Sequence, residues 1–497
     1  MAVTEHQLQV DDRVQSFLSS PGKLLIDGEW VEAASGRTFE TINPATEEKL
    51  AEVAHGETED IDRAVKAARR AFAYEGPWRR MTPSERGRLI WRIGDLIEEH
   101  ADVFAQLESL DNGKPVTVAR AGDVALSADM FRYMAGWPTK ILGDVTPISA
   151  PGEYLSYVLR DPVGVVGQII PWNFPLLMAA WKLAPALACG VTVVLKPAEQ
   201  TPLSALYLGE LMMQAGLPEG VVNIVTGFGD AGAALTAHDD VDKVAFTGST
   251  EVGRLIVKAA AGNLKKVSLE LGGKSPNVVF ADADLKRAIR GAANGIFFNH
   301  GQCCNAGSRL YIESSAFDDV VAGVAEQAKK ITIGPGMDPS TQMGPLISDE
   351  QFQKVLGYLE SGIDAGAEAV VGGGRAADRG YFVQPTILTN TSGDMKVVRE
   401  EIFGPVVCAM PFDDPEDIVP VANDTNFGLA AGVFTRDVSK AHRTAARLRA
   451  GTVWVNTYHV FDAAQPFGGY KESGWGREMG HQVLENYLET KAVCVAL

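Results

Sequence analysis

The sequence predicts an α/β protein built on a doubly wound parallel sheet, and two observations support this prediction. The chain has 497 residues, of which 46% are hydrophobic, and this is enough for two or three compact domains. After residue 162, short apolar segments alternate with longer segments of helical periodicity. Such alternation is typical of right-handed βαβ units, which form a parallel sheet with helices on both faces. We expect strands at 163–170, 191–196, 221–226, 243–247 and 266–271, and helices at 176–189, 203–215, 231–238 and 250–261.

The segment before this alternation is predicted to begin with a flexible tail over residues 1–22. The tail has neither the basic start nor the apolar stretch of a secretory signal. Thr82-Pro83-Ser84-Glu85 then forms a capping box with proline at the first helical position. Apolar residues repeat at helical spacing from residue 89 to residue 107, which predicts one long amphipathic helix.

A second α/β segment follows Gly272-Gly273, where the regular alternation ends. Its expected helices cover 284–298, 316–330, 348–366 and 439–449, and its expected strands cover 309–313, 405–411 and 452–456. Outside both segments, residues 142–159 and 487–497 are extended with alternating apolar residues. Exposed strands of this kind usually pair with another subunit, so we expect an oligomer.

Composition narrows the range of partners. The formal net charge of −18 argues against nucleic acid, because binding phosphates requires clustered Lys and Arg. Residues 176–195 resemble a membrane span, but Lys182 and Pro185 interrupt them and a β-branched run ends them, so we expect a buried helix, a strand and no membrane partner. The five cysteines have neither metal-ligand spacing nor a disulfide framework, which predicts no metal and a reducing, cytoplasmic compartment.

The most distinctive segment reads Phe298-Asn299-His300-Gly301-Gln302-Cys303-Cys304. Two adjacent thiols after a Gly-Gln turn suit a thiolate at a loop tip that attacks a carbonyl. The segment alone equally allows two small buried apolar side chains, which is what most free cysteines are. The rest of the chain has to decide between these interpretations.

Three segments follow strands of the predicted sheet, at the edge where such sheets bind ligands. Lys196 and Glu199 could hold two ribose hydroxyls, with the carboxylate repelling a 2′-phosphate, or could form a solvated turn. Gly248-Ser249 offers backbone N–H groups and a hydroxyl to a phosphate, or is an ordinary helix start. The G-x-G-x-x-G run at 227–232 follows the third strand instead of the first, so it is a weak dinucleotide fingerprint.

Two further residues have the chemistry of catalytic groups. Asn173 stands between two prolines in a fixed turn, where its amide can donate to a developing oxyanion. Glu270 ends an apolar strand beside a Gly-Gly bend, an environment that favours a raised pKa and general-base work. Asparagines in turns and structural acids at strand ends are common, so the residues alone leave both alternatives open.

Taken together, seven segments resemble, in order, motifs of the NAD(P)-dependent aldehyde dehydrogenase superfamily, and the resemblance runs from about residue 24 to the end. The segments are Pro171-Trp172-Asn173-Phe174-Pro175, Lys196-Pro197-Ala198-Glu199, Phe246-Thr247-Gly248-Ser249-Thr250, Glu270-Leu271-Gly272-Gly273, Gly301-Gln302-Cys303-Cys304, Glu401-Ile402-Phe403-Gly404-Pro405 and Pro466-Phe467-Gly468-Gly469-Tyr470-Lys471. The resemblance implies an NAD-binding domain, a catalytic domain and a small β oligomerisation arm of a homotetramer. Their expected bounds are 23–140 and 162–271, 272–472, and 141–161 and 485–497, respectively.

The resemblance also implies a role for individual residues. Cys304 would attack the aldehyde, Asn173 and the Cys304 backbone N–H would hold the oxyanion, and Glu270 would activate the water that hydrolyses the thioester. Retention of Glu270 favours hydrolysis over transfer to coenzyme A. Lys182 and Glu478 match a proton exit. The residues expected to bind NAD are Trp172, Lys196, Glu199, Gly229, Ser249, Glu401 and Phe403.

The expected substrate tunnel is apolar, which favours an apolar aldehyde. Its residues are Phe174, Leu177, Met178, Trp181, Phe298, Cys303, Tyr458, Phe461 and Phe467. Residues 458–464 and 474–478 look like those of bacterial phenylacetaldehyde dehydrogenases, although His459 and Asp462 at the tunnel mouth could favour a polar tail. The alternatives are a broad-specificity aliphatic or semialdehyde dehydrogenase, an acyl transferase that uses Cys304 without nicotinamide, and a non-enzymatic NAD-binding structural protein.

Overall fold

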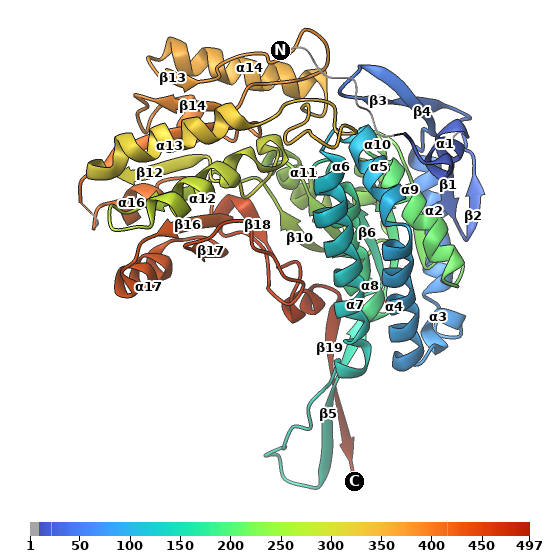
Figure 1. Cartoon of the computed structure of the whole chain (residues 1–497). Coiled ribbons are helices and arrows are strands. Elements are labelled where there is room, and N and C mark those ends of the chain that lie inside the picture. Colours follow the sequence, from blue (N-terminus) through green and yellow to red (C-terminus); the bar gives the residue numbers. More distant parts are fainter. Residues whose placement is uncertain (1–8, 21, 415) are drawn as a thin grey trace.

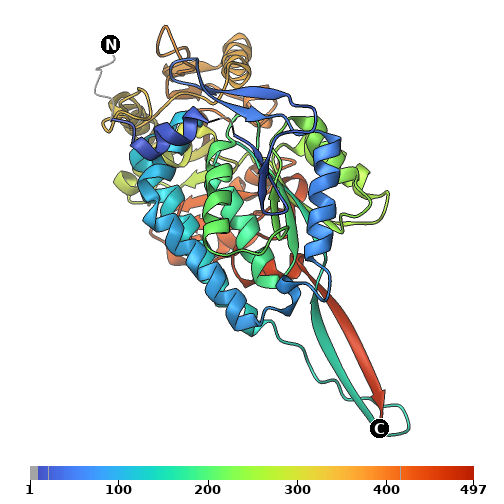
Figure 2. The ribbon, with the colours of Figure 1, turned by 90° about the vertical axis from the view of Figure 1, so that its right-hand side faces the viewer.

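The computed structural model describes residues 9–20, 22–414 and 416–497. In these ranges the chain forms two large sheets covered by helices, and a long two-stranded ribbon that projects away from both (Figures 1 and 2). Most strands of each sheet run parallel and are joined through helices. The predicted α/β class is therefore confirmed.

The first sheet is doubly wound. Among the described residues it has eight strands in the order β18-β10-β9-β6-β7-β8-β1-β2. Its parallel strands are β6 (Val165–Ile169), β7 (Thr192–Lys196), β8 (Val222–Ile224), β9 (Lys243–Thr247) and β10 (Lys266–Glu270). Because β6 pairs with both β7 and β9, the chain winds first to one side and then to the other. The carboxyl ends of β6 and β9 flank the switch point, where doubly wound sheets bind ligands.

Helices cover both faces of this sheet. One face is covered by α2 (Thr58–Ala71), α10 (Gly229–Ala237) and α11 (Thr250–Ala260). The other face is covered by α8 (Pro175–Cys189) and α9 (Leu203–Gln214). These two helices lie under an outer layer of α4 (Pro83–Glu99), α5 (Ala101–Asp111) and α7 (Ala125–Ala135). Every residue of α8 is buried, which confirms that residues 176–195 are a core helix followed by a strand. Within the described ranges, no helix has the length and apolar character needed to cross a membrane.

The single amphipathic helix predicted after Thr82 is wrong, because the structure has two helices there. His100 leaves the helical conformation (φ −105°, ψ 21°) between α4 and α5. Its ring nitrogen Nδ1 lies 2.7 Å from the Tyr207 hydroxyl of α9. The break allows α4 to pack on α7 while α5 packs on α9. The capping box is as predicted, with reciprocal hydrogen bonds between Thr82 and Glu85.

The flexible tail expected over residues 1–22 is wrong for part of its length. Asp12–Ser19 forms helix α1, which the Asp11 side chain caps and whose Val14 is buried in the main core. A helix of two turns gives too short an apolar pattern to be recognised. Residues 1–8 and 21 of this prediction lie outside the described residues. The next strands, also unpredicted, are β1 (Leu24–Ile26) and β2 (Glu29–Val31) at the sheet edge, and the separate pair β3 (Thr38–Asn43) and β4 (Glu48–Ala54).

The second sheet has seven strands in the part of the chain that is described, in the order β13-β14-β15-β12-β11-β16-β17. Their bounds are Pro276–Val279 (β11), Arg309–Glu313 (β12), Glu368–Val371 (β13), Thr386–Thr389 (β14), Val406–Phe412 (β15), Ala430–Phe434 (β16) and Thr452–Val455 (β17). α12 (Leu285–Phe297) and α13 (Phe317–Lys330) cover one face, and α14 (Asp349–Asp364) covers the other. α17 (Val438–Arg447) joins β16 to β17. The predicted strands β12, β15 and β17 are confirmed, whereas β11, β13, β14 and β16 were missed.

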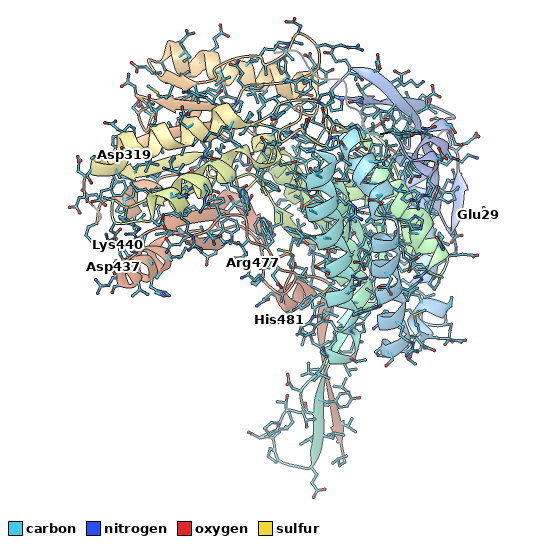
Figure 3. All side chains as sticks on the ribbon, in the orientation of Figure 1. Glu29, Asp319, Asp437, Lys440, Arg477 and His481 are labelled. Carbon is cyan, nitrogen blue, oxygen red and sulfur yellow. The ribbon has the colours of Figure 1, made fainter. Side chains whose placement is uncertain are left out.

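The ribbon consists of β5 (Tyr154–Pro162) and β19 (Leu488–Ala496), paired antiparallel along their full length. These are the two segments whose exposed pattern predicted strands, and they pair with each other. The chain reaches the ribbon from β18 (Gly474–Trp475) through the segment that carries Arg477 and His481 (Figure 3). The ribbon thus pairs residues 154–162 with residues 488–496.

Candidate active site

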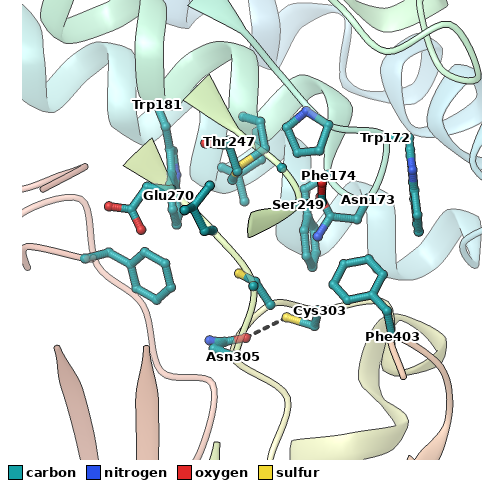
Figure 4. Close-up of a pocket in the computed structure, with 18 of the residues that line it drawn as sticks. Trp172, Asn173, Phe174, Trp181, Thr247, Ser249, Glu270, Cys303, Asn305 and Phe403 are labelled. Carbon is teal, nitrogen blue, oxygen red and sulfur yellow. Dashed lines mark hydrogen bonds between the residues drawn. The ribbon is translucent and has the colours of Figure 1, made fainter. Parts of the chain in front are cut away.

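A cavity of about 270 Å³ lies at the carboxyl ends of β6, β9 and β10, where loops of the second sheet close it (Figure 4). It collects residues that the sequence predicts as catalytic, cofactor-binding and substrate-binding. The predicted residues on its wall are Cys304, Glu270, Asn173, Trp172, Ser249, Glu401, Phe403, Phe174, Leu177, Met178, Trp181, Phe298, Cys303, Phe461 and Phe467. Segments far apart in sequence therefore meet at one site.

The turn before Cys304 has an unusual backbone. Asn299, His300 and Gly301 all have positive φ (48°, 58° and 69°), a conformation that residues with side chains seldom adopt. A Cβ at Gly301 would overlap the carbonyl of Gly404, so only glycine fits this close backbone contact. The turn holds Cys304 at the cavity wall.

The two adjacent thiols have different surroundings. Cys303 is buried and its Sγ donates to Asn305 Oδ1 at 2.6 Å (Figure 4), whereas Cys304 is only partly buried. The neighbouring Cys303 thiol, followed by burial, raises the pKa of the Cys304 thiol well above its ordinary value, and Glu401 and Glu270 act in the same direction. The Cys304 thiol is therefore protonated at neutral pH and needs a proton acceptor before it can act as a nucleophile.

Asn173 is fixed from several sides. Its side-chain Nδ2 donates to the Gln302 carbonyl at 3.2 Å, and its backbone carbonyl accepts from Lys114 Nζ at 3.2 Å and from Asn299 Nδ2 at 3.0 Å. Two residues later, Pro175 begins α8, where its missing N–H costs no helical hydrogen bond. The amide that the sequence predicts as an oxyanion donor is thus held beside the cysteine turn.

Glu270 is an unpaired buried carboxyl. Neither of its oxygens has a hydrogen-bond partner among the described residues. Burial raises the pKa of Glu270 well above its ordinary value and the charge of Glu478 adds to this, whereas Lys182 and Arg477 oppose it. Lys182 Nζ and Glu478 Oε1 form a buried ion pair at 2.6 Å, off the cavity wall. Glu270 can therefore accept a proton with little competition from other contacts.

Trp172, Phe403 and Glu401 form the side of the cavity opposite Glu270. In Figure 4, Glu270 and Trp181 lie on one side, and Trp172 and Phe403 lie on the other. The Trp172 and Phe403 rings meet edge-on, with centroids 5.2 Å apart. Glu401 Oε1 accepts from the backbone N–H of Gly273 at 2.9 Å, and burial raises the pKa of Glu401 to about 7.

The remaining predicted cofactor residues line an edge that continues from the cavity. Lys196 Nζ and Glu199 Oε2 pair at 3.3 Å just after β7, and burial lowers the pKa of Lys196. Ser249 caps α11 and accepts from the N–H of Val252 at 3.2 Å. Gly229 begins α10, with open space where a side chain would stand. Lys196, Glu199 and Gly229 are off the cavity wall.

The predicted substrate residues form a contiguous apolar wall, with one exception. The Trp181 and Phe467 centroids are 5.3 Å apart, and those of Phe461 and Phe467 are 5.9 Å apart. Phe174 stacks on Phe298 at 6.1 Å. Tyr458 lies behind this wall, where its hydroxyl donates to the Asn305 carbonyl at 2.8 Å.

Neither polar residue expected at the tunnel mouth contacts the cavity in the described structure. His459 packs with its ring 5.1 Å from that of Phe298, and burial lowers the pKa of His459 to about 4, so it is neutral at physiological pH. Asp462 is exposed, and its carboxylate accepts from the N–H of Ala464. Their surroundings give no support for recognition of a charged tail.

The structure adds wall residues that sequence reasoning missed. Gly122, Asp123 and Leu126 come from the π-helical segment η1 (Ala119–Val124) and the first turn of α7, and Gln351 and Lys354 come from α14. A π-turn is a short insertion in a helix and often occurs at functional sites. Its residues have no distinctive sequence pattern, so the available signal was only that of an ordinary helix.

A doubly wound sheet with a thiol, an amide and an unpaired carboxyl around an apolar cavity at its switch point is the architecture of a dinucleotide-dependent oxidoreductase. Residues 30–493 match the Aldehyde dehydrogenase family, and the chain belongs to that family. DhaS of Bacillus subtilis (strain 168) is 55% identical over 491 residues, 99% of each chain. The mitochondrial aldehyde dehydrogenase of Homo sapiens is 52% identical over 475 residues, covering 95% of this chain and 92% of its own.

Solved structures agree with these sequence relatives. The NAD⁺ complex of an aldehyde dehydrogenase from Bacillus cereus superposes with a TM-score of 0.97 at 53% identity, covering 99% of this chain and 100% of its own. The protein is therefore an NAD-dependent oxidoreductase that acts on aldehydes.

The residues present fit the cofactor. Thr247 Oγ1 is buried at the cavity without a hydrogen-bond partner among the described residues, so a donor or acceptor is left for a ligand. The start of α11 offers N–H groups to a phosphate. The Lys196–Glu199 pair at the end of β7 offers a cation and a carboxylate to ribose hydroxyls.

Proposed function

We propose that the protein oxidises apolar aromatic aldehydes, such as phenylacetaldehyde, to carboxylic acids through a thioester on Cys304. The observation that carries the substrate class is the wall of Phe174, Trp181, Phe298, Phe461 and Phe467 around the cavity. Such a wall removes an apolar ring from water and offers little to a carboxylate or a quaternary ammonium group.

Acylation begins at the thiol. Cys304 loses its proton to Glu270, and its sulfur attacks the aldehyde carbon to form a thiohemiacetal. The Asn173 amide and the Cys304 backbone N–H donate to the oxyanion, which they stabilise in a site shielded from water. Bound NAD⁺ supplies the acceptor for the hydride that leaves the aldehyde carbon.

Deacylation depends on the buried carboxylate. Glu270 first loses the proton that it took from Cys304. It then takes a proton from water, the resulting hydroxide attacks the thioester carbon, and the carbon–sulfur bond breaks. The departing sulfur receives the proton held by Glu270, which releases the acid and the Cys304 thiol. The buried Lys182–Glu478 pair lies behind Glu270 and gives the proton a charged route away from the cavity. This step consumes one water and leaves the enzyme ready for another aldehyde.

A substrate screen tests this proposal. NADH formation is followed with phenylacetaldehyde, straight-chain aliphatic aldehydes, succinic semialdehyde and betaine aldehyde, and phenylacetaldehyde should give the highest kcat/KM. Phe461→Ala should lower kcat/KM for phenylacetaldehyde by about 10-fold or more, since burying an aromatic ring contributes roughly 1.5–3 kcal/mol, and should change that for acetaldehyde far less. Phe412→Ala is the matched control, because Phe412 packs on Phe280 in the second sheet.

Two results would contradict the substrate class. One is a higher kcat/KM for succinic semialdehyde or betaine aldehyde than for phenylacetaldehyde, and the other is equal loss with both aldehydes in the Phe461 variant. The same screen with NADP⁺ tests the Glu199 carboxylate, which should repel a 2′-phosphate and make NAD⁺ the better cofactor. Turnover of thioesters without NADH formation would favour an acyl transferase, and NAD⁺ binding without turnover would favour a structural protein.

We also infer that the ribbon is the oligomerisation arm of a cytoplasmic homotetramer, and that the two sheets are centres of the NAD-binding and catalytic domains. One face of the ribbon is an apolar stripe. Its members, given by the strand register and the alternation of side chains, are Leu155, Tyr157, Leu159, Val493 and Val495, and the stripe ends at Lys491, which pairs with Leu159. Leu155, Leu159 and Val495 are exposed (43%, 41% and 41%), whereas Tyr157 and Val493 are half-buried, so the stripe is only partly covered within the described chain.

The double variant Leu155→Glu, Leu159→Glu should shift the mass measured by light scattering from that of a tetramer to that of smaller species. Charge on the stripe makes burial against another subunit unfavourable. Leu264→Glu is the control, because Leu264 is exposed but lies in a loop of the first sheet. An unchanged mass for the double variant would exclude the stripe as the interface.

A further inference from the structure

Behind the oxyanion side of the cavity lies a fully buried lysine that the mechanism above does not use. Lys114 follows α5, and its Nζ lies 2.7 Å from Asp123 Oδ2, 3.9 Å from Glu108 Oε2 and 3.2 Å from the backbone carbonyl of Asn173. Burying a lysine is costly unless its charge is paired and its N–H groups are satisfied. Here one of those groups goes to the residue that carries the proposed oxyanion donor.

The same segment holds the Asn173 turn at two more points. Asn112 Nδ2 donates to the Trp172 carbonyl at 2.7 Å, and Glu108 Oε1 accepts from the Leu176 N–H at 3.0 Å, at the start of α8. Together with Lys114, these contacts fix the backbone before, at and after Asn173. Residues 108–114, a segment remote in sequence, therefore hold the turn that carries Asn173.

The hydrogen bond from Lys114 to the Asn173 carbonyl affects the position of the Asn173 side-chain amide. The Asn173 side chain reaches the cavity through only two rotatable bonds, so its backbone position sets where Nδ2 can point. Asn299 Nδ2 donates both to the Asn173 carbonyl and to the Gln302 carbonyl, each at 3.0 Å. Lys114 and Asn299 thus share one acceptor, and that acceptor connects the oxyanion donor to the turn that carries Cys304.

The neighbouring ring is restrained by the same cation. Lys114 Nζ lies 4.3 Å from the centroid of the Phe174 ring, within the range of a cation–π interaction. Phe174 lines the cavity and stacks on Phe298. One buried charge therefore contacts both the residue proposed to hold the oxyanion and the first aromatic residue of the wall.

We propose that Lys114 is a positioning residue that aligns the Asn173 amide with the developing oxyanion. The proposal rests on the proposed role of Asn173. The competing explanation is that Lys114 only compensates the charges of Asp123 and Glu108, in which case its loss would weaken the fold without a specific effect on the oxyanion. Buried ion pairs commonly have such a purely structural effect.

A double-mutant cycle separates these explanations. The measured quantity is the single-turnover rate constant of NADH formation at saturating phenylacetaldehyde and NAD⁺, in the full-length protein. Asn173→Ala should slow this step by about 100-fold or more, as removal of an oxyanion donor does. Lys114→Met should slow it by about 10- to 100-fold, as a misplaced catalytic group does, but should add less than about 2-fold in the Asn173→Ala background.

The matched control is Lys265→Met. Lys265 is also a buried lysine, and its Nζ donates to the carbonyls of Thr236 and His238 at 2.6 and 2.7 Å, far from the cavity wall. Its loss should lower the melting temperature and leave the single-turnover rate unchanged. A rate loss in this control equal to that of Lys114→Met would show that any missing buried cation slows the reaction, and would overturn the proposal.

The other outcomes are equally decisive. If Lys114→Met slows the reaction by the same factor with and without Asn173, Lys114 does not act through that amide and the proposal fails. If Asn173→Ala itself keeps the parental rate, the proposed oxyanion role of Asn173 fails first. If Lys114→Met does not fold, the cycle compares the double variant Lys114→Met, Asp123→Asn with the single variant Asp123→Asn, each with and without Asn173→Ala. The double variant leaves no uncompensated carboxylate at residue 123.

Discussion

Replacing Cys304 with serine should lower the rate of aldehyde oxidation by at least about 10⁴-fold, the scale seen when a catalytic nucleophile is removed. The reason is chemical, because a serine hydroxyl is far less acidic and less nucleophilic than a thiol at the same position. Steady-state NADH formation measures the loss. Mass spectrometry of the protein quenched during turnover should show an acyl adduct in the parent and none in the variant.

Two controls distinguish lost chemistry from lost structure. NADH should still bind the Cys304→Ser protein, as measured by fluorescence titration, because the cofactor edge at Ser249, Lys196 and Glu199 is untouched. Cys494→Ser should keep the parental rate, since Cys494 is exposed on the ribbon. Aldehyde oxidation at the parental rate by the Cys304 variant would refute the covalent mechanism.

The second large effect is expected from Glu270→Gln. The variant should give a burst of NADH, because hydride leaves before water is needed, and then a steady rate about 10²- to 10⁴-fold below the parent. The variant still lacks a base for the thiol, so the burst itself should be slower than in the parent. Stopped-flow absorbance resolves both phases, and an unchanged steady rate would exclude Glu270 as the base for hydrolysis.

The same substitution has a predicted effect on stability, with a definite sign. The pKa of Glu270 is raised by burial, so between its ordinary and its raised pKa the folded protein binds a proton that the unfolded chain has lost. The free energy of unfolding therefore falls as pH rises through that window. A glutamine side chain does not titrate, so Glu270→Gln should raise the melting temperature more at about pH 9 than at about pH 5.

Glu210→Gln is the matched control for the burst measurement. Burial raises the pKa of Glu210 on α9 as well, but that residue lies away from the cavity wall. Its variant should show the parental ratio of burst to steady rate. A melting temperature of the Glu270 variant that gains equally at both pH values would contradict the raised pKa.

The sequence could predict much of the fold because most of its signals are local. The alternation after residue 162 gives the five parallel strands, since each strand is buried on both faces and reads as a short apolar run. Strands such as β16, which contains Gly432, and β11, which begins with Pro276, have weak local signals and depend on their neighbours in the sheet. The break at His100 depends on a partner in α9, which periodicity cannot show.

In the candidate site too, residues with a local sequence signal could be predicted, and residues that depend on distant partners could not. Cys304, Glu270 and Asn173 stand in recognisable segments, and the structure brings them to one cavity. Lys114 and Leu126 have no local signal, because their importance depends on which segments the fold places beside them. Tyr458 fits the apolar pattern of the tunnel, yet its hydroxyl is turned to the Asn305 carbonyl behind the wall.

The close contact between Gly301 and Gly404 has a wider consequence. Gly301 belongs to the turn before Cys304, and Gly404 follows Phe403. The backbones of these two loops meet at a contact that leaves no space for a side chain at Gly301. The turn that carries Cys304 and the loop that carries Phe403 therefore cannot shift independently of each other at this contact. A substitution at Gly301 should therefore disturb both loops at once, whereas exchange of one ring of the aromatic wall for another leaves this backbone contact intact.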